Sequence, residues 1–125
     1  MRDEELAMIM KNTQNLTDKE LAEQLAEYYE KERKERRLIT LQGFMRVVGH
    51  RTELLEIIMK ENSTENIMER FELSKVQAQA LMNLSVRSLV GLNRQKIEDE
   101  INALTIWLTN FHKRRRNLLS TEEQQ

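Results

Sequence analysis

The chain has 125 residues, no cysteine, no proline and a formal net charge of −1 at pH 7, and a third of its residues are charged. The lack of cysteine excludes disulfides and thiolate metal sites. The length suffices for one modest core, the lack of proline leaves helices unbroken, and aromatic residues are only 5% of the chain, so we expect a single all-α domain. The acidic start has no long apolar run, which argues against a signal peptide or a membrane span. The absence of cysteine fits a cytoplasmic protein.

The first half of the chain predicts a short lead-in helix over residues 3–11 and then one long helix. The sequence TDKE, residues 17–20, is typical of a capping box, in which Thr17 and Glu20 satisfy each other's backbone N–H groups. We expect the helix to continue to about Lys60. Its apolar residues recur at helical spacing on both sides of the basic run KERKERR. Gly43 and Gly49 would weaken or bend this helix.

The middle of the chain predicts short helices with clear boundaries. Asn62 or Thr64 is a suitable cap for the helix TENIMERF, and SKVQ, residues 74–77, forms a second capping box. Gly91 is a suitable C-cap in the left-handed conformation that glycine adopts without strain. We therefore expect residues 61–93 to form a small globular helical tip.

The last helix, from about Arg94 to Leu119, has the cleanest periodicity. Its apolar residues follow a heptad spacing with Arg115 as the one charged interruption, which indicates a coiled-coil seam. The predicted fold is a long antiparallel coiled-coil hairpin, with arms at 16–60 and 94–119, a lead-in at 1–15 and a frayed tail at 120–125. Trp107 lies beside the seam and is expected to pack against the other arm. The seam residues are Ile97, Ile101, Leu104, Leu108, Phe111 and Leu118.

Residues 73–104, LSKVQAQALMNLSVRSLVGLNRQKIEDEINAL, resemble the A subunits of type IIA DNA topoisomerases, which are subunits of DNA gyrase or topoisomerase IV. The match includes QAQA at 77–80 and, before it, MERF at 68–71. The resemblance extends more weakly over 16–119. This sequence departs from the family pattern at Asn83, Val90 and Asn93. Further residues that are identical to the family pattern are Leu84, Leu89, Gly91, Leu92, Arg94 and Lys96.

The resemblance implies a non-catalytic role for this chain. The similar region of those subunits is the coiled coil and C-gate, where two subunits dimerise reversibly, while their catalytic tyrosine lies in another domain. Tyr28 and Tyr29 are therefore not expected to be nucleophiles, and no cofactor is expected. The tip is predicted to form a homodimer, although its leucines could instead fill the core of a single chain. The candidate interface residues are Leu81, Met82, Leu84, Val86, Leu89 and Leu92.

Two versions of this function stay open at the level of sequence. The chain is either a fragment of such a topoisomerase or a separately encoded partner and regulator of gyrase or topoisomerase IV. The alternative is a small helical DNA-binding transcriptional regulator, because NLTDKELAEQL resembles the start of many helix-turn-helix proteins. The basic run KERKERR is more typical of a solvated helix face than of a DNA contact, because acidic residues alternate with the basic ones. A metal site is not expected at His50 or His112, because neither has further ligands at a suitable spacing. The candidate DNA contacts are Arg114, Arg115 and Arg116.

Overall fold

The computed structural model describes the backbone of residue 4 and residues 17–123, and the side chains of residue 4 and residues 17–117. Every regular element within this part of the chain is an α-helix, and no strand occurs in it. The predicted all-α class is therefore confirmed for the described residues. The lead-in helix predicted at 3–11 lies, apart from residue 4, outside them.

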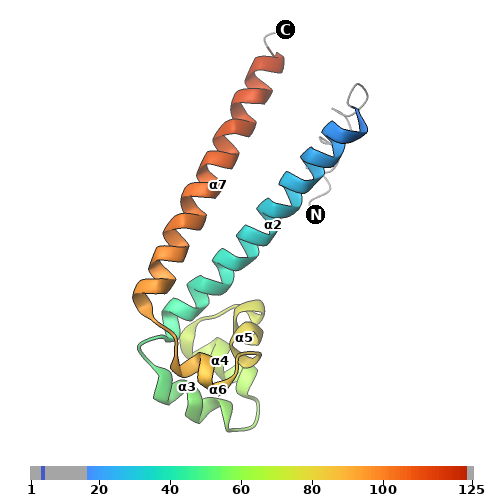
Figure 1. The fold of residues 1–125 in the computed structure, drawn as a ribbon. Coiled ribbons are helices and arrows are strands. Elements are labelled where there is room, and N and C mark those ends of the chain that lie inside the picture. The colour runs from blue at the N-terminus through green and yellow to red at the C-terminus, as the bar shows by residue number, and fades with distance from the viewer. Residues whose placement is uncertain (1–3, 5–16, 124–125) are drawn as a thin grey trace.

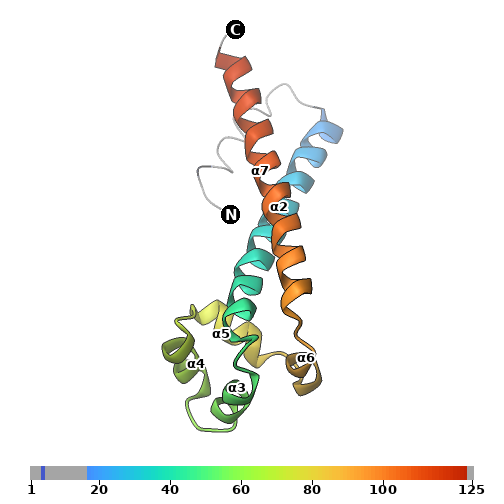
Figure 2. The same ribbon diagram turned by 90° about the vertical axis from the view of Figure 1, so that its left-hand side faces the viewer.

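Two helices of 30 residues each, α2 (Asp18–Val47) and α7 (Arg94–Glu123), lie side by side in both views of the fold (Figures 1 and 2). They run in opposite directions, because α2 ends and α7 begins at the same end of the molecule. The structure does not test the predicted coiled-coil register or the predicted limits of the arms and the tip. Four short helices, here called the end cluster, lie where α2 ends: α3 (Arg51–Ile58), α4 (Ser63–Phe71), α5 (Lys75–Met82) and α6 (Val86–Val90).

The predicted helix starts agree with the observed ones at three places. The Thr17 hydroxyl accepts a hydrogen bond from the backbone N–H of Glu20 at 3.2 Å. Ser74 and Gln77 form the full reciprocal capping box at the start of α5. Asn62 occupies the cap position of α4, but its side chain makes no cap hydrogen bond. Local sequence therefore determines where these helices begin.

The first long helix is shorter than expected. It ends at Val47 instead of near Lys60, and α3 begins at Arg51. The intervening turn is closed by a 2.8 Å hydrogen bond from the His50 N–H to the Val47 carbonyl. Glycine disfavours the helix at position 49, and the turn lets both Val48 and the side chains of α3 reach the core, so tertiary packing overrides the continuous apolar pattern.

The expected left-handed cap at Gly91 is wrong. Gly91 has φ −82° and ends the five-residue helix α6 in the right-handed region. The left-handed cap lies instead at Glu72, with φ 54°, after α4. The backbone N–H groups of Glu72 and Leu73 both donate to the Met68 carbonyl, as is common at a left-handed helix end. A guanidinium N–H of Arg46 on α2 also donates to the Glu72 carbonyl at 2.7 Å, so a local and a distant contact together support this conformation.

The core runs from the end of α2 through the end cluster to the first half of α7. Because each short helix contributes one or two buried side chains, none of them has a core without the others. The buried members of this cluster are Leu41, Phe44, Val47, Val48, Leu54, Ile67, Phe71, Leu73, Ala78, Leu81, Leu89, Ile97 and Leu104.

Helices α2 and α5 approach each other closely at Gly43. A Cβ atom at this position would lie 2.9 Å from the Cβ of Gln77, so glycine is required by the contact. The Gln77 side chain accepts from the Ser74 N–H at 3.0 Å and donates to the Ile39 carbonyl of α2 at 2.8 Å. One glutamine therefore both closes the cap of α5 and ties α5 to α2.

We predict that Gly43→Ala destabilises the protein. The added methyl group must push α5 away from α2, at a cost of about 1–3 kcal/mol, and the helix propensity of alanine offsets only about 1 kcal/mol of this. Urea unfolding followed by circular dichroism measures the free energy of unfolding.

The control is Gly49→Ala, because a Cβ there meets only a terminal nitrogen of Arg94 at 3.4 Å. This variant should keep or slightly exceed the wild-type stability. Equal stability of the two variants would contradict the close approach of α2 and α5.

Candidate functional site

The face of α7 toward α2 is apolar along most of its length. Ile97, Leu104, Leu108 and Phe111 are buried, and Ile101 is half-buried. These positions follow the heptad spacing noted in the sequence, and α7 packs along α2. The side chain of Leu118, the last predicted seam residue, lies outside the described side chains.

An ion pair joins the two long helices near the end cluster. The Arg37 guanidinium on α2 donates to both carboxylate oxygens of Glu100 on α7, at 2.8 and 3.2 Å. These hydrogen bonds lower the pKa of Glu100 below its ordinary value and raise that of Arg37. The pair is about half exposed, so it adds little stability but fixes the register of α2 against α7.

Aromatic rings and cations replace the aliphatic contacts farther along the long helices. The Trp107 ring stacks on Phe111 with centroids 5.4 Å apart, and the amine of Lys34 from α2 lies 5.1 Å from the Trp107 ring centroid. The Arg115 guanidinium lies 5.7 Å from the Phe111 ring centroid. Trp107 thus contacts the other long helix, through a cation of KERKERR.

Tyr28 is engaged in structural contacts on α2. Its ring is buried, and its hydroxyl donates to the Glu32 carboxylate at 2.9 Å, which is the main reason that the pKa of Glu32 is lowered. Lys31, only 5% exposed, lies 5.4 Å from the Tyr28 ring centroid and 3.7 Å from a carboxylate oxygen of Glu35. Lys31 of KERKERR therefore forms the expected pair at helical spacing, but its side chain is buried and not solvated.

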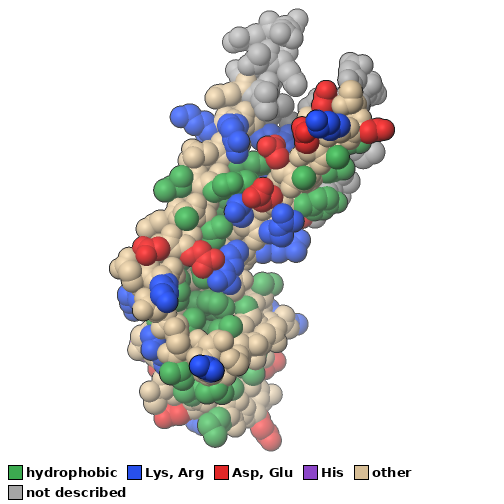
Figure 3. Space-filling view, viewed as in Figure 1, with side chains coloured by type: hydrophobic (Ala, Val, Ile, Leu, Met, Phe, Trp, Pro, Cys, Tyr) green, Lys and Arg blue, Asp and Glu red, His purple; other side chains and the backbone are tan. Residues whose placement is uncertain are grey.

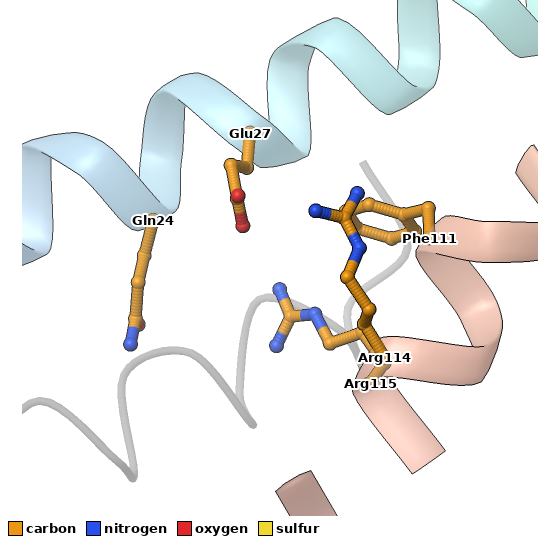
Figure 4. Close-up of a pocket in the computed structure, with 5 residues that line it drawn as sticks. All are labelled: Gln24, Glu27, Phe111, Arg114 and Arg115. Carbon is orange, nitrogen blue, oxygen red and sulfur yellow. The ribbon is translucent and has the colours of Figure 1, made fainter. Parts of the chain in front are cut away.

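A small cavity of about 120 Å³ lies between α2 and α7 near their far ends, as Figure 4 shows. Arg114 and Arg115 extend from α7 toward the side where Gln24 and Glu27 of α2 lie, and Phe111 completes the lining. The three predicted DNA contacts therefore differ in position. Arg115 is half-buried over Phe111, whereas Arg114 and Arg116 are exposed.

The structure separates the six predicted interface residues into three groups. Leu81 and Leu89 are 0% and 3% exposed and belong to the core, so they cannot meet a partner without local opening. Met82, Leu84 and Leu92 are half-buried against that core. Val86 alone is strongly exposed, at 66%.

Sequence reasoning missed Val90, which is 54% exposed and lies one helical turn after Val86. The spacing i, i+4 places both valines close together on α6, and the buried Leu89 lies beside them, where the helix meets the core. This spacing was visible in the sequence. Figure 3 shows hydrophobic side chains gathered on this side of the end cluster, over α6.

Arg51 holds α6 and the start of α7 in place. Its guanidinium donates to the Val90 carbonyl at 3.1 Å and also to the Leu92 carbonyl. These hydrogen bonds join α3 to the end of α6, the helix that carries the exposed valines. The surrounding segment, residues 73–93, is poor in charge: Lys75 and Arg87 are its only charged residues, in a chain that is one-third charged. Low charge around exposed apolar side chains is typical of the centre of a protein interface.

The described residues contain no group of three or more His, Asp and Glu side chains placed to hold a metal ion. His50 and His112 each lie beside one carboxylate, Glu53 at 3.6 Å and Glu35 at 4.0 Å. No helix in the described part of the chain is long and apolar enough to span a membrane.

Comparison with known proteins gives one consistent similarity, and no protein-family model matches the chain. The chain is 38% identical over 80 residues to the DNA gyrase A protein of Halalkalibacterium halodurans, covering 61% of this chain and 10% of that protein. It is 32% identical over 87 residues to the DNA gyrase A protein of Staphylococcus aureus, covering 66% and 9%. The chain thus spans about a tenth of these relatives and is similar to part of the A protein of a type IIA topoisomerase.

We predict that Leu81→Ala and Leu89→Ala each destabilise the fold by about 2–5 kcal/mol, because each leaves a cavity in the core. Val86→Ala should change the free energy of unfolding by less than about 0.5 kcal/mol, because the side chain is largely exposed. Urea unfolding at low protein concentration measures all three. A cost at Val86 equal to that at Leu89 would contradict the exposed position of Val86 and the buried position of Leu89.

We also predict that Arg37→Gln returns the pKa of Glu100 toward its ordinary value, which carboxyl NMR titration measures. Since the folded-state pKa of Glu100 is lowered, the pair stabilises the protein above the ordinary carboxyl pKa and loses this effect as the pH falls through the folded value. The wild type should therefore lose its small advantage over Arg37→Gln, under about 1 kcal/mol, in acid. An unchanged Glu100 pKa would contradict the contact.

Proposed function

We propose that this chain is a non-catalytic dimerisation module resembling the C-gate region of type IIA topoisomerases, and that it pairs through the end cluster. The observation that carries the proposal is the similarity to part of the DNA gyrase A protein, together with the outward-facing valines of α6. The two long helices would serve as arms that hold the end cluster away from the rest of an assembly.

The arrangement of α6 suits a contact that forms and opens. Two exposed valines cover far less than the roughly 800 Å² per partner of a standard interface. Pairing through them would recruit the half-buried Met82, Leu84 and Leu92, which lie close by in the sequence. An interface of this size and apolar character supports weak, reversible association, whereas an obligate dimer would bury more.

A second copy of this chain is the first partner that this surface fits. Because copies of one chain pair most commonly about a two-fold axis, α6 of one copy would face α6 of the other. The A protein of a type IIA topoisomerase is the second partner we propose, since it carries a segment similar to this one. The chain would then act as a partner or regulator of gyrase or topoisomerase IV.

The alternative, a small helix-turn-helix regulator, has less support at the segment that suggested it. NLTDKELAEQL leads into α2, which continues without a turn from Asp18 to Val47. A helix-turn-helix motif needs a short turn after its first helix. The candidate first helix of that motif is therefore part of a long arm.

We predict that Val86→Asp and Val90→Asp convert a concentration-dependent dimer into a monomer, because each places a charge at the centre of the apolar contact. Sedimentation equilibrium over a range of protein concentrations measures the mass. Circular dichroism should show unchanged helicity, since both side chains are exposed in the single chain.

The matched control is Ile106→Asp, an exposed apolar residue on α7 at 61% exposure. This variant should keep the wild-type association constant. A wild type that stays monomeric at every concentration, or a mass that is the same in all three variants, would contradict pairing through α6.

We predict, separately, that the wild-type chain associates with a full-length DNA gyrase A protein and that Val86→Asp weakens this association. The reason is that the similar segment of the larger protein would present a comparable surface. Size-exclusion chromatography of the mixture measures co-elution, with Ile106→Asp as the control. Equal co-elution of both variants would assign any association to another surface.

A further inference from the structure

The segment that carries α6 is charged in one sign only. Residues 73–97 contain four Lys and Arg residues and no Asp or Glu, whereas the whole chain has 20 Lys and Arg against 21 Asp and Glu residues. Figure 3 shows Lys and Arg side chains beside the hydrophobic ones on this side of the end cluster. The small apolar surface at Val86 and Val90 therefore belongs to a segment that has cations but no carboxylate of its own.

Exposed arginines lie close in the chain to both exposed valines. Arg87 follows Val86 in α6, and Arg94 begins α7 four residues after Val90. Both arginine side chains are exposed. Because α6 has only five residues, it is about 7–8 Å long at the helical rise of 1.5 Å per residue. The backbone of Arg87 therefore lies within this short distance of either valine.

A third guanidinium lies at the end of α6 without a counter-ion. Arg51 of α3 is half-buried and donates only to the carbonyls of Val90 and Leu92, which carry no net charge. Its Nε atom is buried and has no hydrogen-bond partner among the described residues. No described carboxylate forms a salt bridge with Arg51, Arg87 or Arg94, although other arginines of the chain do form such pairs. The positive charge around the end of α6 is thus uncompensated.

Pairing about a two-fold axis does not supply the missing negative charge. In such a contact the same patch of each copy meets itself, so the cations of one copy approach those of the other. Exposed like charges repel over the Debye length, which is about 30 Å at 0.01 M salt and about 8 Å at 0.15 M. Self-pairing through α6 is therefore opposed by charge at low ionic strength and favoured by any anion that lies between the copies.

We propose that the paired α6 surfaces bind a free oxyanion of the phosphate class between the Arg87 and Arg94 side chains of the two copies. This inference rests on the proposed pairing through α6. The planar guanidinium matches the oxygens of phosphate and donates to two of them at once, and such charge-assisted hydrogen bonds are roughly twice as strong as neutral ones. A bound oxyanion would replace repulsion at the contact by attraction, so its concentration would control whether the two copies stay together.

Two features favour a phosphate-class ion over a halide. A phosphate group carries up to two negative charges near neutral pH, and its several acceptor oxygens can bond arginines from both copies. A halide offers a single charge and no fork of oxygens for a guanidinium. A phosphate ester would have to place its substituent inside the apolar contact, so the free ion fits better.

The test is sedimentation equilibrium of the full chain, in sodium chloride and in sodium phosphate of matched ionic strength and equal pH. One bound ion per dimer raises the association constant about tenfold when phosphate is present at about ten times its dissociation constant. The logarithm of the association constant should rise with the logarithm of the phosphate concentration at a slope of up to about +1. Chloride should strengthen pairing only by screening.

The double variant Arg87→Gln, Arg94→Gln should pair more strongly than the wild type at low salt, because the repulsion is reduced. It should also lose the specific response to phosphate. Phosphate strengthens the burial of apolar surface in general, and this effect remains in the variant, so the difference between variant and wild type isolates the oxyanion site. The matched control, Lys60→Gln, Lys113→Gln, removes the same charge from exposed positions outside residues 73–97 and should respond as the wild type does.

The outcomes separate the oxyanion site from the pairing itself. Equal association constants of the wild type in chloride and phosphate, or a full phosphate response in the double variant, would overturn the site and leave the pairing intact. A wild type that is monomeric in every buffer would overturn the pairing and the site with it. Glycerol phosphate should strengthen pairing less than inorganic phosphate, and an equal effect would contradict a free ion enclosed between the copies.

Discussion

The close contact between Gly43 of α2 and Gln77 of α5 joins the end cluster to the long helices. It lets the two backbones approach so closely that the Gln77 side chain can close its own helix cap and bond the Ile39 carbonyl at once. Once α5 is held against α2, the chain must return through α6 to the start of α7. The QAQA segment thus has a physical role in this chain: Gln77 anchors α5, and Ala78 fills the core beside it.

The outward face of α6 is a consequence of this anchoring. Leu81 at the end of α5 and Leu89 of α6 are buried in the core, and Arg51 donates to one carbonyl at the end of α6 and to another just after it. What remains exposed on so short a helix is Val86 and Val90, in a segment with few charges. The same packing that completes the core of one chain therefore leaves a small apolar surface exposed, which supports the proposed pairing.

Much of the fold could be predicted from the sequence because its signals are local. Caps at Thr17 and Ser74 act over three residues, and the burial of α7 follows its own repeat. The left-handed conformation at Glu72 could not be predicted, because glutamate rarely adopts it and one of its supporting contacts comes from Arg46, 26 residues away. The candidate site was predicted only in part. Hydrophobicity identified Leu81, Leu89 and Val86 alike, and only the packing shows that the two leucines are buried in the core while Val86 is exposed.

In the dimer that we propose, two copies meet at α6 while their long helices extend away from the contact. Because the chain has no cysteine, one spin label can be attached at Asn83→Cys beside α6 and, in a second sample, at Asn110→Cys on α7. Double electron–electron resonance then measures the distance between the labels of two copies. Pairing through α6 predicts a short distance between the labels at position 83 and a much longer one between the labels at position 110. No dipolar signal at position 83, or a shorter distance at position 110, would contradict it.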